Sequence, residues 1–169
     1  DGSISRYSES NLKELVKIIR ISKPSLILTT NEDRHPDHTA TMHLTYEAAF
    51  LAKLHRYPLG EDLPPHNTEF IFRYIQFIDS IPSFVVDISE YIDAKVKLVM
   101  CHRSQFNPDG KPTILTTSDF TEYVKSRARF MGQRAFCKYG EGFLSRTPVQ
   151  IDNLLSIASN RLLPSSQNK

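Results

Sequence analysis

The feature that most constrains this chain is an apolar run at residues 26–30, followed shortly by the sequence His35-Pro36-Asp37-His38. A short apolar run predicts a buried strand, and the helical spacing of apolar residues from about Thr39 to His55 predicts a helix. The run is apolar on both faces, which is typical of a parallel strand covered by helices on each side. Because open α/β sheets bind ligands at the carboxyl ends of their strands, the two histidines are expected to lie at a binding site.

The remaining elements are expected to alternate between helices and strands. Asn11 and Glu14 fit a capping box for a first helix that ends before Pro24. Asp87 and Glu90 fit a second capping box. Further strands are expected at residues 69–77, 84–86 and 137–143, and further helices at residues 87–105, 118–132 and 147–163. The pattern predicts an α/β layered fold, with residues 1–163 forming one domain and residues 164–169 a tail.

Composition excludes several classes of protein. With 169 residues, 40% hydrophobic and 24% charged, the chain is long and apolar enough to bury a core. A formal net charge of +2 argues against a nucleic-acid-binding protein, and no apolar run is long enough to span a membrane. Cys101 and Cys137 are far apart in sequence, which indicates buried free thiols in a reducing compartment, and the chain is expected in the cytoplasm. A disulfide between them is the alternative.

The histidine turn has two interpretations. In the first it is a polar turn in which Asp37 caps the following helix and both histidines are exposed to solvent. In the second it forms half of a catalytic site. His38, in the first helical turn, would direct its ring toward a metal, and His35 would contact the substrate. Asp37 would then orient an imidazole and stabilise its charged form.

The histidines of this sequence do not by themselves complete a zinc site. A catalytic zinc is usually held by three protein ligands and keeps an open position for water, and only His38 is a clear ligand here. His43 would point about 140° away around the helix from His38. His102 is expected to be packed inside the fold, whereas His55 and His66 flank a loop and are expected to be solvated.

Four segments, taken in order, resemble the GlcNAc-phosphatidylinositol de-N-acetylase (PIG-L, LmbE-like) family of zinc deacetylases. The resemblance implies a Rossmann-like sheet with flanking helices, and it points to bacterial and archaeal members that act on N-acetylglucosamine derivatives. Four motifs in the right order are far more specific than any one of them. The matching segments are residues 34–39, residues 85–89 with Lys95 and residues 102–106, residues 127–132, and residues 139–143.

The resemblance assigns roles to individual residues. It implies that His38 is a zinc ligand, and that His35 stabilises the oxyanion and protonates the leaving amine. Asp37 would be the charge partner of His35. The substrate-binding residues that it implies are Arg103, Tyr139 and Glu141. The alternative for these three is structural: a salt bridge for Arg103, and hydrogen bonds at a strand end for Tyr139 and Glu141.

One family motif has no match in this sequence. The family's first motif, Ala-His-Pro-Asp-Asp-Glu, supplies two zinc ligands and a carboxylate general base. Asp1 and Gly2 resemble the family at a point well past that motif. We therefore expect the N-terminal third to two-fifths of the family fold to be missing from this chain, together with two metal ligands and the base.

The function predicted from the sequence is zinc-dependent removal of acetate from an N-acetylglucosamine-type sugar. The expected partner is a small amino-sugar substrate, without nucleic acid or a membrane span, and the resemblance implies a homo-oligomer. The rival prediction is a non-catalytic fragment, or a sugar-binding or assembly module on the same fold. A nucleotide-binding protein is disfavoured because the chain has no Gly-rich loop. The proline-rich loop at residues 57–68 is expected to determine which sugar is cleaved.

Overall fold

The computed structural model describes residues 2–60, 62–77, 79–102, 119–155 and 157. Within these residues, four strands form one mixed sheet in the order β1-β2-β4-β3. The strands are β1 (Leu26–Thr29), β2 (Phe70–Tyr74), β3 (Phe84–Asp87) and β4 (Gly140–Ser145), and the helices are α1 (Glu9–Ser22), α2 (Pro36–Ala52), α3 (Ile92–Met100) and α6 (Phe120–Arg134). β1 and β2 are parallel, whereas β4 is antiparallel to both β2 and β3. The predicted α/β fold is confirmed.

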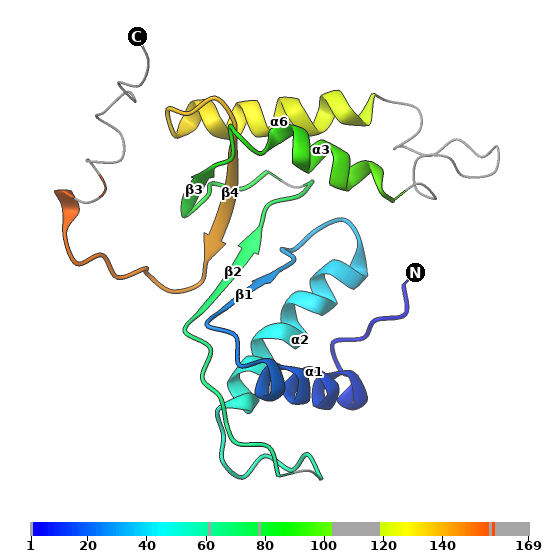
Figure 1. Ribbon diagram of the computed structural model, residues 1–169. Helices are drawn as coiled ribbons and strands as arrows, with labels where there is room; N and C mark the ends of the chain where they lie inside the picture. The colour runs from blue at the N-terminus through cyan, green and yellow to red at the C-terminus, as the bar shows by residue number, and fades with distance from the viewer. Residues whose placement is uncertain (1, 61, 78, 103–118, 156, 158–169) are drawn as a thin grey trace.

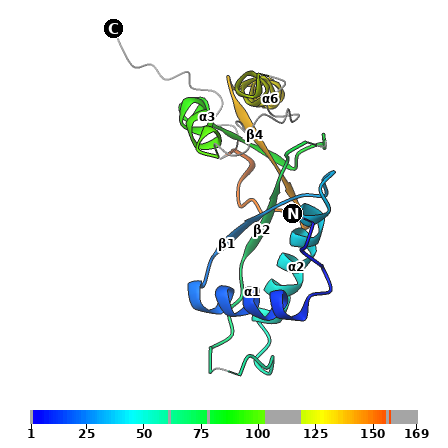
Figure 2. The same cartoon turned by 90° about the vertical axis from the view of Figure 1, so that its right-hand side faces the viewer.

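Two groups of helices flank this sheet (Figure 1). Helices α1 and α2 pack against each other beside β1, and α3 and α6 pack together near β3 and β4. Figure 2 shows the two groups at opposite ends of the molecule. Each group has its own small core of buried side chains, formed by Val16, Ile19, Ala48, Ala49 and Ala52 in the first group and by Ile88, Ile92 and Ala128 in the second.

The helices α1, α2, α3 and α6 all begin at residues other than those predicted. Helix α6 begins at Phe120 rather than at residue 118, after its N-cap Asp119. Helix α1 is capped by Ser8, whose side chain accepts a hydrogen bond from the Asn11 N–H, so the helix starts before the predicted capping box. Asp87 does not cap α3. Its Oδ1 instead accepts a hydrogen bond from the Ser89 N–H (2.9 Å), and this tight turn delays the helix to Ile92.

Helix α2 begins at Pro36, three residues earlier than predicted. Its N-cap is His35, whose Nδ1 accepts a hydrogen bond from the Asp37 N–H (3.2 Å). Proline suits the first helical position because the N–H that it lacks would have no partner there. The histidine turn is therefore the first turn of α2, and Asp37 is not its N-cap.

Some predicted features differ or lie outside the described residues. The outer strand β1 exposes Leu26 and Leu28, so among the described residues it is not covered on both faces as predicted. Cys101 and Cys137 do not form a disulfide, in agreement with the prediction, but Cys101 is exposed and Cys137 is only partly buried. The helix predicted at residues 147–163 does not begin at residue 147, because residues 147–153 are not helical and helical structure appears only at residues 154, 155 and 157. Residues 156 and 158–163 of that prediction, and the predicted tail at residues 164–169, lie outside the described residues. Within the described residues, no helix is both long enough and apolar enough to cross a membrane.

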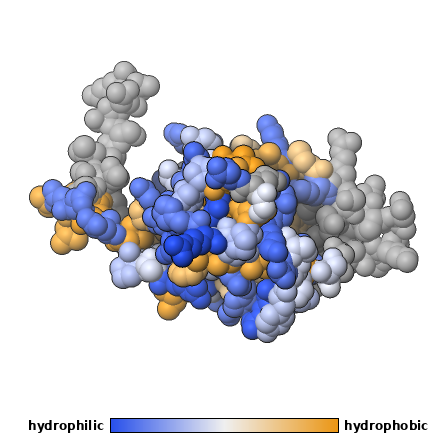
Figure 3. All heavy atoms as spheres, turned by 90° about the horizontal axis from the view of Figure 1, so that it is seen from below, coloured by the Kyte–Doolittle hydropathy of each residue, from blue (hydrophilic) through white to orange (hydrophobic). Residues whose placement is uncertain are grey.

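At the amino end of the sheet, where the parallel strands β1 and β2 begin, Arg20 links α1 to the end of α2 and to the loop that follows it. This side chain is 3% exposed and donates hydrogen bonds to the carbonyls of Ala52, Leu54 and Leu63. His66 adds a ring hydrogen bond to the Pro24 carbonyl (2.9 Å). Viewed from below, toward this end, the surface is mostly hydrophilic, with hydrophobic residues in separate patches (Figure 3).

Candidate functional site at the carboxyl end of β1

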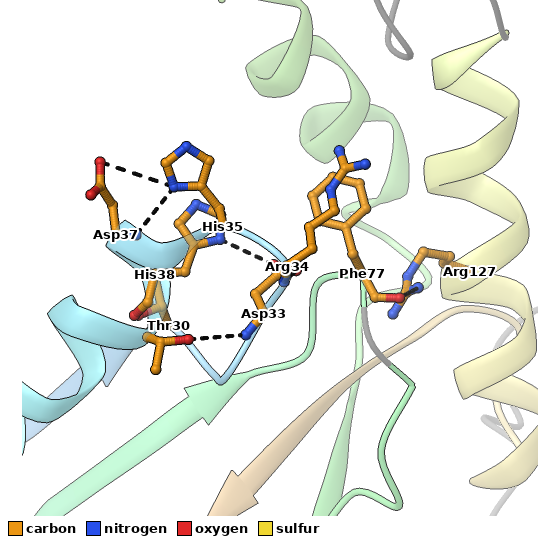
Figure 4. Close-up of polar contacts among 9 residues, drawn as sticks. Thr30, Asp33, Arg34, His35, Asp37, His38, Phe77 and Arg127 are labelled. Atoms are coloured by element: carbon orange, nitrogen blue, oxygen red, sulfur yellow. Dashed lines mark hydrogen bonds and ion pairs between the residues drawn. The ribbon is translucent and has the colours of Figure 1, made fainter. Parts of the chain in front are cut away.

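The histidine turn lies at the carboxyl end of the sheet, where the parallel strands β1 and β2 end. The chain leaves β1 at Thr29 and enters α2 at Pro36. Thr30 holds the start of the helix in place, because its Oγ1 donates a hydrogen bond to the His38 carbonyl (2.6 Å). Figure 4 shows His35, Asp37 and His38 gathered at this first turn of α2.

His38 is oriented by a carboxylate that the sequence analysis missed. Its Nδ1 lies 3.0 Å from Oδ2 of Asp33, whose side chain is only 2% exposed (Figure 4). Because a carboxylate accepts hydrogen bonds, Nδ1 carries the proton in this pair. The lone pair of the neutral ring is then on Nε2, which is free to act as a ligand because the His38 side chain is 31% exposed.

His35 has the opposite arrangement. Its Nδ1 accepts the Asp37 N–H, so this nitrogen carries the lone pair and Nε2 of the neutral ring carries the proton. The ring centroids of His35 and His38 are 5.2 Å apart. The turn therefore presents a lone pair on Nε2 of His38 and a proton on Nε2 of His35. The first suits a metal ligand, and the second suits a hydrogen-bond donor.

Asp37 contacts both His35 and the start of the chain. Its Oδ2 accepts the Gly2 N–H (2.8 Å), and its Oδ1 accepts the Ile4 N–H (3.2 Å). Oδ2 also lies 4.0 Å from Nδ1 of His35. The Gly2 hydrogen bond is the main cause that lowers the pKa of Asp37, and His35 contributes less. Asp37 is thus an ionised group at the turn, although most of its hydrogen bonding serves the preceding segment.

Among the described residues, the histidine turn can supply one ligand of a metal site but not a complete set of ligands. A metal-ligating histidine usually gives its second ring nitrogen to a carboxylate, as His38 does to Asp33. In the part of the chain that the structure describes, however, no three His, Cys, Asp or Glu side chains lie together as a metal would require. His102, predicted to be packed inside the fold, is exposed at the end of α3.

Of the three residues predicted to bind substrate, the structure describes two, Tyr139 and Glu141, and their hydrogen bonds do not reach the histidine turn. Arg103 lies outside the described residues. Glu141, on β4, makes an ion pair with Lys95 of α3 (2.7 Å). The Tyr139 N–H donates a hydrogen bond to Ser89 Oγ (3.1 Å), and its carbonyl accepts one from the Ile88 N–H. The hydrogen bonds of Tyr139 and Glu141 thus reach α3 and the turn before it, rather than His35 or His38.

Arg34 and Phe77 link the histidine turn to helix α6. The guanidinium carbon of Arg34 lies 4.4 Å from the centroid of the Phe77 ring. Arg127, on α6, donates a hydrogen bond to the Phe77 carbonyl (3.4 Å). Figure 4 shows Arg34 and Phe77 between the histidines and Arg127. Sequence reasoning had no signal for this contact, because the three residues are far apart in the chain.

The loop at residues 57–68 does not border the histidine turn. It precedes β2, whereas the turn follows β1, and the two strands are parallel. The loop therefore lies at the amino end of the sheet and the turn at the carboxyl end (Figure 1). The predicted role of this loop in choosing the sugar is wrong on this geometry.

Comparison with known proteins finds similarity to diacetylchitobiose deacetylases. No protein-family model matches the chain. It is 29% identical over 143 residues to diacetylchitobiose deacetylase of Thermococcus kodakarensis, an alignment that spans 80% of this chain and 50% of that protein. The chain thus spans half the length of this relative.

Three solved structures resemble this one. A conserved protein of Thermus thermophilus has a TM-score of 0.77 and 30% identity, covering 89% of this chain and 64% of that one. The N,N'-diacetylchitobiose deacetylase of Pyrococcus horikoshii has a TM-score of 0.70 and 28% identity, covering 85% and 53%. A 4-carboxy-2-hydroxymuconate hydratase of Pseudomonas putida, at 20% identity and a TM-score of 0.71, shares the fold alone. The chain is a distant homologue of the diacetylchitobiose deacetylases over part of their length.

Proposed function

We propose that this chain forms part of a zinc-dependent deacetylase that hydrolyses the N-acetyl group of an N-acetylglucosamine-type sugar. The observation that carries the proposal is the pair of histidines with opposite tautomers at the first turn of α2. The similarity to proteins named as diacetylchitobiose deacetylases supports the same reaction class. Deacetylation needs both a metal ligand and a proton donor, and the turn offers one of each.

His38 is the metal ligand that this chain would contribute, through Nε2. Asp33 would keep Nε2 free of a proton by holding the hydrogen on Nδ1. Zinc, when bound, would supply a Lewis acid for the acetyl carbonyl and for the attacking water. The other ligands and the carboxylate base would come from outside the described residues, where the family's unmatched first motif belongs.

His35 would act on the substrate rather than on the metal. In its neutral form, Nε2–H can donate a hydrogen bond to the oxyanion that develops on the acetyl oxygen. In its protonated form, Nε2 can give its proton to the departing amine. When both ring nitrogens carry protons, the Asp37 N–H must leave Nδ1, and Nδ1–H can instead turn toward the Asp37 carboxylate, whose Oδ2 lies 4.0 Å away.

The test compares zinc content and acetate release for the natural-length protein and its His38→Ala variant. We expect the variant to lose bound zinc and acetate release together. His43→Ala, five residues along the same helix, is the matched control and should keep both. Unchanged zinc content and activity in His38→Ala would refute the assignment of this site.

A second candidate is a sugar-binding or assembly module on the same fold. It is favoured by the single position that the described donors offer to a metal. Such a protein would bind N-acetylglucosamine without zinc and would release no acetate. Calorimetric titration of the sugar in the presence of a chelator separates the two functions.

A further inference from the structure

A cavity of about 300 Å³ lies close to the histidine turn, where β2 and β4 meet the helices α3 and α6. One wall is formed by residues 74–77 at the end of β2, and another by residues 140–142 of β4. Lys95 and Val99 line it from α3, and several side chains line it from α6. This volume is at the lower end of the range for small-molecule sites.

The cavity is joined to the histidine turn by one side chain. Phe77 lines the cavity, and the guanidinium of Arg34 lies over its ring at 4.4 Å. Arg34 directly precedes His35 in the chain. A ligand whose reacting group lies at His35 and His38 could therefore extend past Arg34 into the cavity.

The charges that line the cavity are paired with one another. Lys95 makes its ion pair with Glu141 at 2.7 Å. Arg127 contacts Asp79 at 3.5 Å and donates a hydrogen bond to Tyr123 Oη at 3.1 Å. Because each of these cations already has a carboxylate, the cavity is suited to an uncharged ligand rather than to a phosphate or a carboxylate.

The rest of the lining is largely apolar and aromatic. The rings of Phe77 and Tyr123 are stacked with centroids 6.2 Å apart, and those of Phe120 and Tyr123 with centroids 5.5 Å apart. Val99 and Met131 complete this surface. Aromatic faces pack well against another ring, so a flat or ring-shaped apolar group fits this lining.

Gln76 is the polar exception. Gln76 is one of the lining residues, but its Oε1 is buried without a hydrogen-bond partner among the described residues, so a ligand would reach it only once the side chain turns toward the cavity. A buried acceptor without a partner is unfavourable, and a donor on a bound ligand would remove that penalty. One unpaired acceptor suits a ligand with a single hydroxyl or N–H, whereas a sugar ring with several hydroxyls would need more partners.

We propose that the cavity binds the group attached to the anomeric carbon of the sugar, and that this group is uncharged, ring-sized and largely apolar. The proposal rests on the deacetylase function proposed above. The sugar would lie over His35 and His38, with its acetamido group at the turn. The aglycone would pass Arg34 and place one hydrogen-bond donor at Gln76.

The experiment measures binding and acetate release separately on the natural-length protein. The probes are methyl, phenyl and 4-hydroxyphenyl glycosides of N-acetylglucosamine. We expect the phenyl glycoside to bind at least tenfold more tightly than the methyl glycoside by calorimetry, and to show a correspondingly lower KM. The 4-hydroxyphenyl glycoside should bind more tightly still.

Two variants test the cavity itself. Val99→Trp fills it and should abolish the preference for phenyl over methyl while acetate release from the methyl glycoside continues. Leu98→Trp, on the exposed side of the same helix, is the matched control and should keep the preference. Gln76→Leu removes the acceptor with little change in shape and should abolish only the gain from the 4-hydroxyl group.

The outcomes distinguish this proposal from the proposed function. Acetate release from both glycosides with equal affinity would overturn the cavity proposal and leave the deacetylase function standing. A phenyl preference in binding without any acetate release would overturn the deacetylase function while supporting the cavity as a site for apolar rings. A phenyl preference that survives Val99→Trp would overturn the assignment to this cavity.

Discussion

The two ends of the parallel pair β1 and β2 each contain a partly or fully buried arginine, and the two arginines are used differently. At the amino end, Arg20 donates to three backbone carbonyls and holds the loop at residues 57–68 against α2. At the carboxyl end, Arg73 donates to Asn31 Oδ1 (3.0 Å) and contacts Met42 Sδ, while its buried Nε has no partner among the described residues.

The two arginines differ in how completely their hydrogen-bonding groups are paired within the fold. At the amino end, the polar groups of Arg20 are satisfied within the fold, as buried groups usually are. Toward the carboxyl end, Arg73 Nε and Gln76 Oε1 are buried without such partners, and His38 leaves Nε2 open. Substitution of Arg20 should therefore change folding, whereas substitution of the carboxylate that orients His38 should change binding.

The largest expected effect is at Arg20. Arg20→Met should reduce the free energy of unfolding by about 3 kcal/mol, because three hydrogen bonds are lost and buried carbonyls are left without donors. Urea unfolding followed by circular dichroism measures this. Lys13→Met, on the exposed side of the same helix, removes only a surface ion pair with Glu9 and should reduce the free energy of unfolding far less. Equal losses in the two variants would contradict a structural role for Arg20.

Substitution of Asp33 is expected to change zinc binding rather than folding. Asp33→Asn should weaken zinc binding about 10- to 100-fold, because an amide holds the proton on Nδ1 of His38 less firmly than a carboxylate does. Competition with a chelator on the natural-length protein measures the affinity. Asp62→Asn, in the loop at the amino end, is the control and should leave zinc binding unchanged. Unaltered affinity in Asp33→Asn would show that this pair does not serve a metal.

The strand, the turn and the helix around this site were predictable because their signals are local. An apolar run precedes the turn, and Pro36 stands where a first helical position tolerates proline. The helix start was predicted three residues late because histidine is not among the usual capping residues. Asp33 was missed because the fold of the turn, rather than a recognised spacing, brings it to His38.

The cavity could not be predicted from the sequence at all. It is lined by segments around residues 74–77, 95–99, 120–131 and 140–142, which only the packing of α3 and α6 on the sheet brings together. The loop at residues 57–68 was predicted to select the sugar because of its length and its prolines. Parallel pairing of β1 with β2 places it at the opposite end, which no local pattern could reveal.

A smaller effect on the free energy of unfolding is expected when one threonine is replaced at each end of the strand pair. Thr30→Val removes the hydrogen bond to the His38 carbonyl and should cost about 1 kcal/mol of unfolding free energy. Thr68→Val, near the start of β2, removes a buried hydroxyl that has no partner among the described residues, so it should be neutral or slightly stabilising. Urea unfolding of both variants gives the comparison. A larger loss in Thr68→Val would contradict the hydrogen bonding described for the two ends.

The smallest effect is a dependence on pH. It is expected at the carboxyl end, where the hydrogen-bond acceptor is the carboxylate of Asp37, and not for the carbonyl acceptors of Arg20 at the amino end. The Gly2 N–H lowers the pKa of Asp37 below its usual value in the folded chain. A depressed carboxylate pKa contributes stability above its unfolded value, about 3.9, and this contribution is lost as the pH falls through the folded pKa. The contact between the Gly2 and Ile4 amides and α2 should therefore weaken below about pH 4.

The hydrogen bonds of Arg20 at the amino end should persist in that range, because their acceptors are carbonyls, which do not titrate. Amide chemical shifts of Gly2 and Ile4, followed from neutral to acidic pH beside the Nε–H signal of Arg20, measure the contrast. In Asp37→Asn the pH dependence of the two amides should disappear, since the side chain can no longer titrate. Parallel titration of both regions would mean that acid loosens the whole fold, and the comparison between the two ends would then fail.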